Sequence, residues 1–412
     1  MSGLSALGKI PPRAGQRYGL ISPMNTRRNF LKNTVFSGIT FCSCGVLDNA
    51  FAQGAPGGPE NNDFGNQPAL NYRHPKMGTK HAPVVIDGQR VKVIDVHAHC
   101  FFPEAVALAG KGVSVNGAVK GGPQHYIPVT DKEAVQVRLD SMDAMGVDMQ
   151  VLSSNVFWYG KDVALAEEIC RINNDNLAKL CAAHPTRFSA FASIALQHPE
   201  LAVQQLEAVM KRPGFRGAAI QANVQGLEFS NPKFDPIWAK AEALGAVLFI
   251  HPQSTPELAK RFKGNGWLSN TIGNPLDTTI ALQHLIFDGT LDKFPKLKIL
   301  SAHGGGFLGS YAPRIDHSCF VSPSNCDPTV VLKKKPTEYL NQMYFDSLVF
   351  TPEALRHLVA QVGASQVMVG TDQPIPWNEA PVEHVLATPL SNPDKVAILG
   401  RNAAQVLNIP NF

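Results

Sequence analysis

Five side chains that can bind a metal ion stand at or just beyond the ends of four apolar segments. They are His97, His99, His251, His303 and Asp372. Side chains in a β-strand alternate between its two faces, so His97 and His99 are expected to point the same way. Imidazole nitrogens and a carboxylate are common ligands of divalent cations. Two histidines alone could be satisfied core residues, but three further candidates at other strand ends favour a metal site.

The residue types indicate a role for each candidate. We expect His97, His99 and His251 to be the nitrogen ligands. Asp372 is expected to be the carboxylate ligand and to take part in catalysis, because a carboxylate can also hold a proton of bound water. His303 is the predicted general acid/base beside the metal, since an imidazole pKa near neutrality suits proton transfer.

Two neighbouring features complete this prediction. Three glycines, 304–306, follow His303, and glycine lets the backbone approach a substrate closely. A phosphate-binding loop is disfavoured, because no lysine followed by serine or threonine comes after the glycines. Asp95 is expected on the face of His97 and His99, where its carboxylate could accept a hydrogen bond from a ligand.

The same donor set predicts how many metals bind and of which kind. Two-metal barrels of this type bridge their metals with a modified lysine at the end of the fourth strand, and residues 218–223 contain no lysine. One metal is therefore expected. Three neutral nitrogens, one carboxylate and an open position suit Zn2+, while manganese, cobalt or iron could bind the same set.

Eight segments are continuous apolar runs rather than alternating ones, which is typical of strands buried on both faces. The predicted strands are 91–97, 147–153, 188–194, 217–222, 246–251, 297–303, 343–348 and 366–371. Helical spacing and capping residues predict helices between them. The predicted helices are 131–145, 163–183, 200–211, 236–244, 277–287, 352–362 and 393–407.

This alternation predicts an α/β fold, a (β/α)8 TIM barrel of the metal-dependent hydrolase type. An open, doubly wound sheet is the alternative. It is disfavoured because the ligand candidates come from the first, fifth, sixth and eighth strands, which converge only in a closed barrel. Long segments after the fifth and sixth strands, 252–273 and 316–342, are candidate lids and subunit contacts.

The N-terminal part predicts export. Residues 26–32, TRRNFLK, resemble a twin-arginine signal, an apolar run spans 35–47, and Ala50, Phe51 and Ala52 form a small-x-small cleavage site. The run is shorter than the ~20 residues that span a bilayer, which disfavours an anchor. We expect residues 1–52 to be a twin-arginine signal peptide, 53–82 a flexible tether and 83–412 a single barrel.

That organisation predicts a protein exported by the twin-arginine machinery and soluble in the periplasm after cleavage near Ala52. Translation could begin at Met1 or at Met24. Residues 1–52 carry a net charge of +5, while the whole chain carries +4, so the remainder has a net charge of −1. A body this close to neutral predicts no nucleic-acid partner. Cys319 and Cys326 lie in one loop and could pair after export, whereas Cys100 is expected to pack in the core.

Several motifs together resemble the amidohydrolase superfamily, most closely the aminocarboxymuconate-semialdehyde decarboxylase group. The likeness covers most of the chain, from about residue 97 to 407. It is carried by residues 97–99, 147–153, 249–252, 292–299, 302–306, 314–315 and 370–374. These motifs are specific for the family and the metal site, and less so for the substrate.

The resemblance implies a metal-dependent, non-oxidative decarboxylase that is often a homodimer. It carries the four metal ligands and the acid/base histidine over to the residues named above. It also implies that Arg314 reaches a neighbouring subunit's site and holds a substrate carboxylate. A surface ion pair is the alternative interpretation of Arg314.

The resemblance also has departures. The family has an arginine for the substrate in the loop after the first strand, where this chain has His125 and no arginine. A lid tryptophan of the family aligns with Asn270, and Trp267 is nearby. Arg314, Trp267, Asn270 and His125 are therefore the substrate-binding candidates. The family enzyme is cytoplasmic, so an exported relative is expected to act on another unsaturated or aromatic carboxylic acid, a small molecule.

Two other functions stay open at this point. A hydrolase of a lactone, ester or amide would use metal-bound water as the nucleophile in the same site. Release of carbon dioxide distinguishes the decarboxylase from that hydrolase. A non-catalytic binding protein is disfavoured, because structural zinc sites are usually closed and rich in cysteine.

Overall fold

The computed structural model describes most of the chain from residue 79 onward. The described residues are 79–110, 132–154, 159–253, 255–375, 377 and 380–410. The predicted signal peptide, the tether up to residue 78 and the substrate-binding candidate His125 lie outside them. Within these ranges, no helix combines the length and apolar character needed to cross a membrane.

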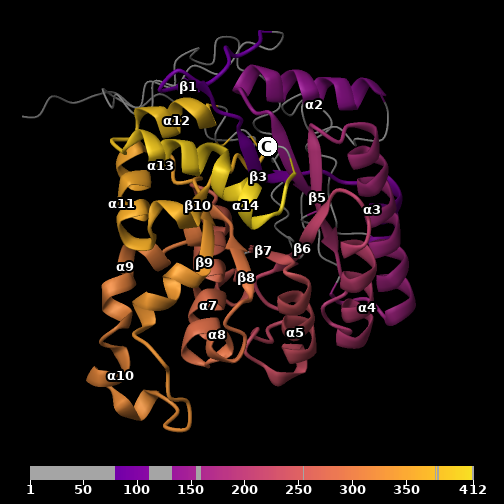
Figure 1. The fold of residues 1–412 in the computed structure, drawn as a ribbon. Coiled ribbons are helices and arrows are strands. Elements are labelled where there is room, and N and C mark those ends of the chain that lie inside the picture. Colours follow the sequence, from indigo (N-terminus) through magenta and orange to yellow (C-terminus); the bar gives the residue numbers. More distant parts are fainter. Residues whose placement is uncertain are drawn as a thin grey trace, which may run out of the picture. The chain divides into compact units, whose positions relative to one another are not determined.

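Eight parallel strands form the centre of the fold (Figure 1). They are β3 (Ile94–His99), β4 (Met149–Ser153), β5 (Phe188–Ser193), β6 (Phe215–Gln221), β7 (Val247–His251), β8 (Lys298–Ser301), β9 (Met343–Asp346) and β10 (Val367–Met368). Each strand pairs with the next along the chain, and bridges from Asp95 to Val369 and from Ala98 to Gln373 join β10 to β3. The sheet therefore closes as the predicted barrel, and the open sheet is excluded.

Helices cover the outside of the barrel (Figure 1). The longer ones are α2 (Lys132–Met145), α3 (Val163–Ala183), α4 (Pro199–Met210), α5 (Asp235–Leu244), α7 (Gly273–Phe287), α9 (Leu308–Ile315) and α11 (Pro352–Val362). Side chains cap the first turns of two of them: Asp162 accepts from the backbone of Leu165, and Thr351 accepts from that of Ala354. The predicted helices are confirmed to within a turn, apart from a longer start of α7.

Shorter elements occupy the loops and the ends of the described chain. They are β1 (Val85–Ile86), β2 (Gln89–Arg90), α1 (Pro103–Ala109), α6 (Leu268–Thr271), α8 (Thr290–Lys293), α10 (Ser318–Val321), α12 (Pro381–Ala387), α13 (Asn392–Val396) and α14 (Asn402–Val406). Strands β1 and β2 form a hairpin whose turn residues, Asp87 and Gly88, both have positive φ, as a tight antiparallel turn requires.

The predicted closing helix is one helical segment with a π turn inside it. Residues Ala397–Arg401 form this turn between α13 and α14. A Cβ atom at Gly400 would lie only 2.2 Å from the carbonyl oxygen of Lys92, so glycine permits the close approach to the strand. The end of the segment then packs Ala403 and Leu407 into the apolar interior of the barrel, beside the first residues of β4 and β7.

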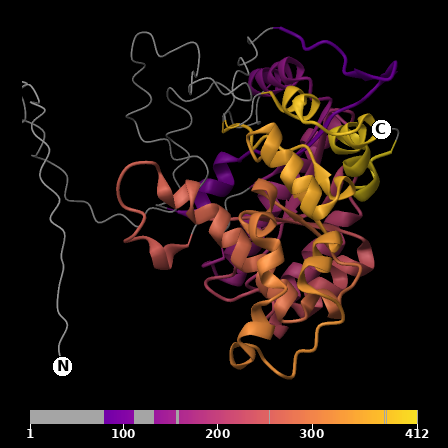
Figure 2. The ribbon, with the colours of Figure 1, turned by 90° about the vertical axis from the view of Figure 1, so that its left-hand side faces the viewer.

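The two long loops differ in what they carry. Figure 2 shows the segment that contains α6 extending beyond the strand ends, while α10 lies farther down on the same view. Cys319 and Cys326 form a disulfide in the α10 loop, as their spacing suggested. Cys100 is buried in the apolar layer, which confirms its packing role, and burial raises the pKa of its thiol to about 12.

Candidate metal centre

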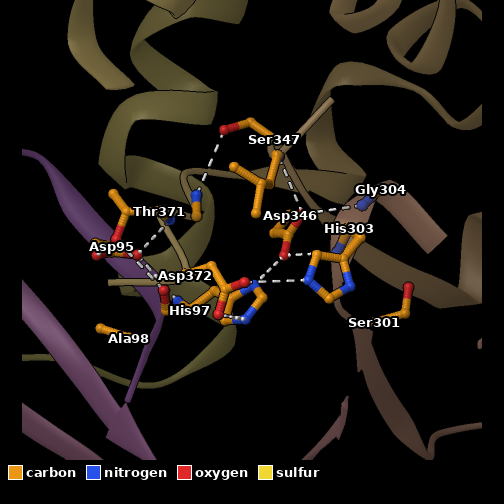
Figure 3. A network of polar contacts seen from close by, with 12 residues as sticks. Asp95, His97, Ala98, Ser301, His303, Gly304, Asp346, Ser347, Thr371 and Asp372 are labelled. Atoms are coloured by element: carbon orange, nitrogen blue, oxygen red, sulfur yellow. Dashed lines mark hydrogen bonds and ion pairs between the residues drawn. The ribbon is translucent and has the colours of Figure 1, made fainter. Parts of the chain in front are cut away.

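The five predicted donors meet at the carboxyl ends of the strands, and Figure 3 shows His97, His303 and Asp372 among them. Donor atoms of His97, His251, His303 and Asp372 all lie within 4.8 Å of one another. His99 is adjacent: its Nε2 atom lies 2.9 Å from Oδ1 of Asp372 and 3.0 Å from Nε2 of His97. The compact set of four thus includes the predicted acid/base His303, and His99 contacts two of its members. All five residues therefore belong to one centre.

A bulge in β3 corrects the predicted position of Asp95. The pairing of β3 with β4 shifts register between Asp95 and Ala98. Ile94 and Val96 pack in the barrel interior, and the His97 ring also lies inside, 5.0 Å from the Phe249 ring. Simple alternation would have placed Asp95 beside His97, but the bulge changes the phase. Asp95 instead faces the layer between barrel and helices, and it accepts from the backbone N–H of His97, not from the imidazole.

Asp346, at the end of β9, performs the role that we expected of Asp95. Its Oδ2 atom accepts a hydrogen bond from Nδ1 of His97 at 2.5 Å, and both side chains are fully buried. It also accepts from the backbone N–H groups of His303 and Gly304, each at 2.9 Å. This contact fixes the His97 tautomer, so that Nε2 faces the centre. A carboxylate at a strand end is the sequence signal that marks Asp346, which was not among the predicted residues.

The turn after β8 places His303 beside Asp372. His303 has a φ of 56°, and its Nε2 atom lies 3.4 Å from Oδ2 of Asp372. The glycines that follow pack against protein: a Cβ at Gly305 would meet Phe345 at 2.7 Å, and one at Gly306 would lie 2.1 Å from a carbonyl oxygen of α7. They therefore let the turn fit between β9 and α7, which revises their predicted approach to a substrate.

Burial and charge set the protonation of the centre. Burial alone raises the pKa of Asp372, but the surrounding imidazoles outweigh it and hold this pKa well below its usual value. Burial lowers the pKa of His99 to about 4 and lowers that of His251 well below its usual value. Burial also acts to lower the pKa of His97, yet the carboxylates of Asp372 and Asp346 raise it to about 10. Ionised carboxylates and neutral imidazoles are the forms that bind metals.

The arrangement fits a divalent cation. Oδ1 of Asp372 is buried and accepts no hydrogen bond within the described part of the chain, although Nε2 atoms of His99 and His97 lie 2.9 and 3.2 Å away. The pKa of about 10 leaves a proton on His97 that a bound cation would displace. With Nδ1–H still pointing to Asp346, Nε2 would then present a lone pair toward Nε2 of His99, 3.0 Å away. Such converging electron pairs in a buried site favour a cation between them.

The substrate-binding candidates are spread more widely. Arg314 is exposed on α9, away from the buried donors, and His125 lies outside the described residues. Asn270 is buried on α6. Trp267, at the start of α6, stacks on Trp377 with ring centroids 5.8 Å apart and an interplanar angle of 14°.

Trp377 and Phe350 extend this contact and were not foreseen. Phe350 follows β9 and packs edge-on against Trp377, with centroids 5.9 Å apart. Together with Trp267 they bring an aromatic cluster onto three loops that follow β7, β9 and β10. Nothing local marks these residues in the sequence, because the loops are far apart along the chain.

Comparisons with known proteins place the centre in context. Residues 94–409 match the family model described as Amidohydrolase. The chain is 33% identical over 280 residues to 2-amino-3-carboxymuconate-6-semialdehyde decarboxylase of Dictyostelium discoideum, covering 67% of this chain and 77% of that protein. It is 29% identical over 303 residues to gamma-resorcylate decarboxylase of Polaromonas sp., covering 70% of this chain and 91% of that protein. The resemblance inferred from the motifs is thereby confirmed.

A solved structure is similar over the barrel. It is a dihydroxybenzoic acid decarboxylase of Polaromonas sp. with bound manganese and the inhibitor 2-nitroresorcinol. The TM-score is 0.68 at 26% sequence identity, and the match covers 78% of this chain and 98% of that one. A metal-containing decarboxylase therefore shares this fold.

Proposed function

This chain belongs to the amidohydrolase family, and from that membership and its buried His/Asp centre we propose that it is a metal-dependent, non-oxidative decarboxylase. The substrate class is an unsaturated or aromatic carboxylic acid. The observation that carries the proposal is the convergence of four histidines and one aspartate at the carboxyl ends of the barrel strands, where such barrels hold their active sites. The enzyme is a carbon–carbon lyase, with release of carbon dioxide as its signature.

We assign His97, His99, His251 and Asp372 as ligands of one divalent metal. A bound cation would supply positive charge that holds the substrate's carboxylate or a neighbouring oxygen. Zinc is our first expectation for this donor set, and manganese, found in the Polaromonas structure, is its main competitor. Elemental analysis of the purified protein, followed by reconstitution with each metal, decides between them.

His303 is the proposed acid/base. The carbon–carbon bond to the carboxylate breaks, carbon dioxide leaves, and the electron pair stays on the substrate carbon, which takes a proton from the imidazole. Asp346 holds the backbone of His303, while Asp372 contacts its Nε2 atom. The side chain is 14% exposed, whereas those of Asp346 and Asp372 are fully buried, so the ring can be reached from the mouth of the barrel.

The experiment is carbon dioxide release from a panel of unsaturated and aromatic carboxylic acids. We expect release that stops with a chelator and returns with added metal. His303→Asn should lower kcat about 10²- to 10⁴-fold while the metal stays bound. Wild-type turnover in His303→Asn would refute its role. Hydrolysis of lactones or esters with uptake of labelled water oxygen, and no carbon dioxide, would assign the protein to the hydrolases instead.

We also propose export by the twin-arginine route to the periplasm, with cleavage near Ala52. The motif at residues 26–32 supports it, and the Cys319–Cys326 disulfide suits an oxidising compartment. Replacing Arg27 and Arg28 by lysine should leave the precursor in the cytoplasmic fraction. The boundaries 1–52, 53–82 and 83–412 stay predictions, which mass spectrometry of the exported protein tests.

A homodimer is the last part of the proposal. The exposed position of Arg314 on α9 leaves its guanidinium available to a second subunit. Sedimentation analysis gives the oligomeric state. Mixing Arg314→Ala with an inactive Asp372→Asn chain should restore activity in part of the mixed dimers if Arg314 acts across the interface.

A further inference from the structure

The junction between β3 and the chain from β10 onward closes the barrel with an irregular backbone ladder. The N–H groups of Val96 and His99 donate to the carbonyls of Val369 and Gln373, and the N–H of Asp372 donates to the carbonyl of His97 at 2.8 Å. Strand β10 has only two residues, and isolated bridges join it to β3, whose register slips at the bulge. By contrast, β6 and β7 pair over five consecutive residues. Yet this junction carries three of the five donors, His97, His99 and Asp372. Buried side chains add further hydrogen bonds to this irregular ladder.

Asp95 links the two strand ends directly. Its carboxylate accepts from the backbone N–H groups of His97 at 3.0 Å and Thr371 at 3.2 Å, and from the Thr371 hydroxyl at 2.6 Å (Figure 3). His97 is a donor of the centre, and Thr371 directly precedes Asp372. The side chain is fully buried, so these bonds are not exchanged with water.

Arg138, on α2, approaches the same junction from outside the barrel. Its guanidinium is 1% exposed and donates to the carbonyl oxygen of His99 at 2.7 Å. It also lies within 3.4 Å of the side-chain oxygens of Gln150 and Gln373. Gln373 directly follows Asp372, so Arg138 also contacts the neighbour of a proposed metal ligand.

Gln150 connects the two charges. Its amide nitrogen donates to Asp95 at 2.9 Å, while its amide oxygen faces Arg138 at 3.3 Å. We call Asp95, Arg138, Gln150, Thr371 and Gln373 the junction cluster. A buried carboxylate and a buried guanidinium are costly to desolvate, and burying them adds little stability compared with apolar packing. The junction cluster binds backbone atoms of His97 and His99, two proposed metal ligands. It also binds the backbone N–H of Thr371, which directly precedes the proposed ligand Asp372.

We propose that Asp95 and Arg138 are positioning residues. They hold β3 and β10 so that the donors of His97, His99 and Asp372 converge, and they thereby set metal affinity without touching metal or substrate. This inference rests on the proposed metal centre. Its general basis is that groups which orient metal ligands typically contribute about 10- to 100-fold to metal affinity.

The test uses the full-length protein and manganese as the probe. We would measure the Mn2+ dissociation constant, the Mn2+ EPR spectrum and the unfolding midpoint for Asp95→Asn and Arg138→Lys. The matched control is Asn174→Ala, because Asn174 is buried and binds both the N–H and the carbonyl of Ser193, at the end of β5, where no donor lies.

We expect the two junction variants to weaken Mn2+ binding about 10- to 100-fold and to change the EPR splitting. Asn174→Ala should lose stability and bind Mn2+ like the wild type. If Asp95→Asn does not fold, the near-isosteric Thr371→Val provides the same comparison through the lost 2.6 Å bond. Wild-type affinity and spectrum in the junction variants, or an equal loss in Asn174→Ala, would overturn the proposal.

These measurements separate two failures. A wild-type protein that binds Mn2+ but releases no carbon dioxide refutes the decarboxylase function, and the comparison of dissociation constants still tests the positioning role. A wild-type protein that binds no Mn2+ and no other divalent metal refutes both.

Discussion

The β3–β10 junction and the β6–β7 pair hold neighbouring strands of the same barrel together in different ways. At β6–β7 the backbone ladder is continuous, and a close backbone approach at Gly217 locks the strands together. At the junction the ladder is irregular, and buried polar side chains reinforce it. The donors of the centre concentrate at the junction. The proposed metal ligands thus concentrate where buried side chains supplement an irregular backbone ladder.

Two buried aspartates show the same contrast. Imidazoles surround Asp372 and hold its pKa well below the usual value. Asp277, on α7, accepts from the backbone of Gln253 after β7 and from Asn223 after β6. Among the described residues no cation lowers its pKa, and burial raises that pKa to about 7. One residue type is therefore kept ionised on one side of the barrel and is readily protonated on the other, because of what packs around it.

The largest expected effect is the loss of metal binding and activity on replacing Asp372, which lies at the β3–β10 junction. Asp372→Asn removes the carboxylate charge from among four imidazoles. We expect loss of metal binding and a drop in kcat/KM of roughly a thousandfold or more, since a metal supplies several kcal/mol of charge stabilisation. Metal content by elemental analysis and carbon dioxide release measure it. If the variant keeps its metal content and its carbon dioxide release, Asp372 is not a metal ligand, and the contrast with Asp277 fails.

The second prediction concerns the β6–β7 pair and the free energy of unfolding rather than catalysis. A Cβ at Gly217 would lie 1.8 Å from the carbonyl oxygen of Val247. Gly217→Ala should therefore force the two strands apart and cost about 3 kcal/mol in the free energy of unfolding, measured with denaturant. Gly226→Ala is the control, because Gly226 also has positive φ but nothing lies within 4 Å of its Cβ position. Its cost should be only about 1 kcal/mol.

If the two alanine variants lose equal stability, the positive φ alone accounts for the cost of Gly217→Ala. The close approach of β6 to β7 would then contribute nothing to that cost. The metal affinity of both variants should remain that of the wild type where they fold, because Gly217 pairs with Val247 at the start of β7, whereas the ligand His251 stands at the other end of that strand.

The last effect is the pH dependence of stability at Asp277. Its folded pKa of about 7 exceeds the unfolded value of 3.8, so the folded state binds the proton more tightly. The resulting stability is present at low pH and is lost as pH rises from about 4 to about 7. Asp277→Asn should flatten this decline by up to about 1.4 kcal/mol per pH unit, the slope for one proton. Urea midpoints from pH 4 to 8 measure it.

In this comparison the other titrating groups are shared by both proteins, so the difference between the two profiles isolates Asp277. Parallel profiles would show that Asp277 is ionised in the folded state across this range. Its environment would then resemble that of Asp372, and the contrast between the two sides would fail.

Local patterns determined the strands, the main helices and the donors. Apolar runs of strand length and capping residues depend on neighbours in sequence, so their positions were predicted closely, including α3 and α11 in full. The histidines were found for the same reason: each stands at a strand end, and parallel strand ends meet in a closed barrel. The Cys319–Cys326 pair is close in sequence and was also foreseen.

Only the tertiary structure decided the contacts that orient those donors. The bulge in β3, which places Asp95 outside the interior, depends on how β3 pairs with β4 and β10. Asp346 is 249 residues from the His97 that it holds, and Arg138 reaches the junction from a helix on the outer layer. No periodicity in the sequence records such pairings, because they arise when barrel closure brings distant strand ends together. The sequence by itself therefore located the residues that we propose as ligands and acid/base, and the closed barrel decided how they are held.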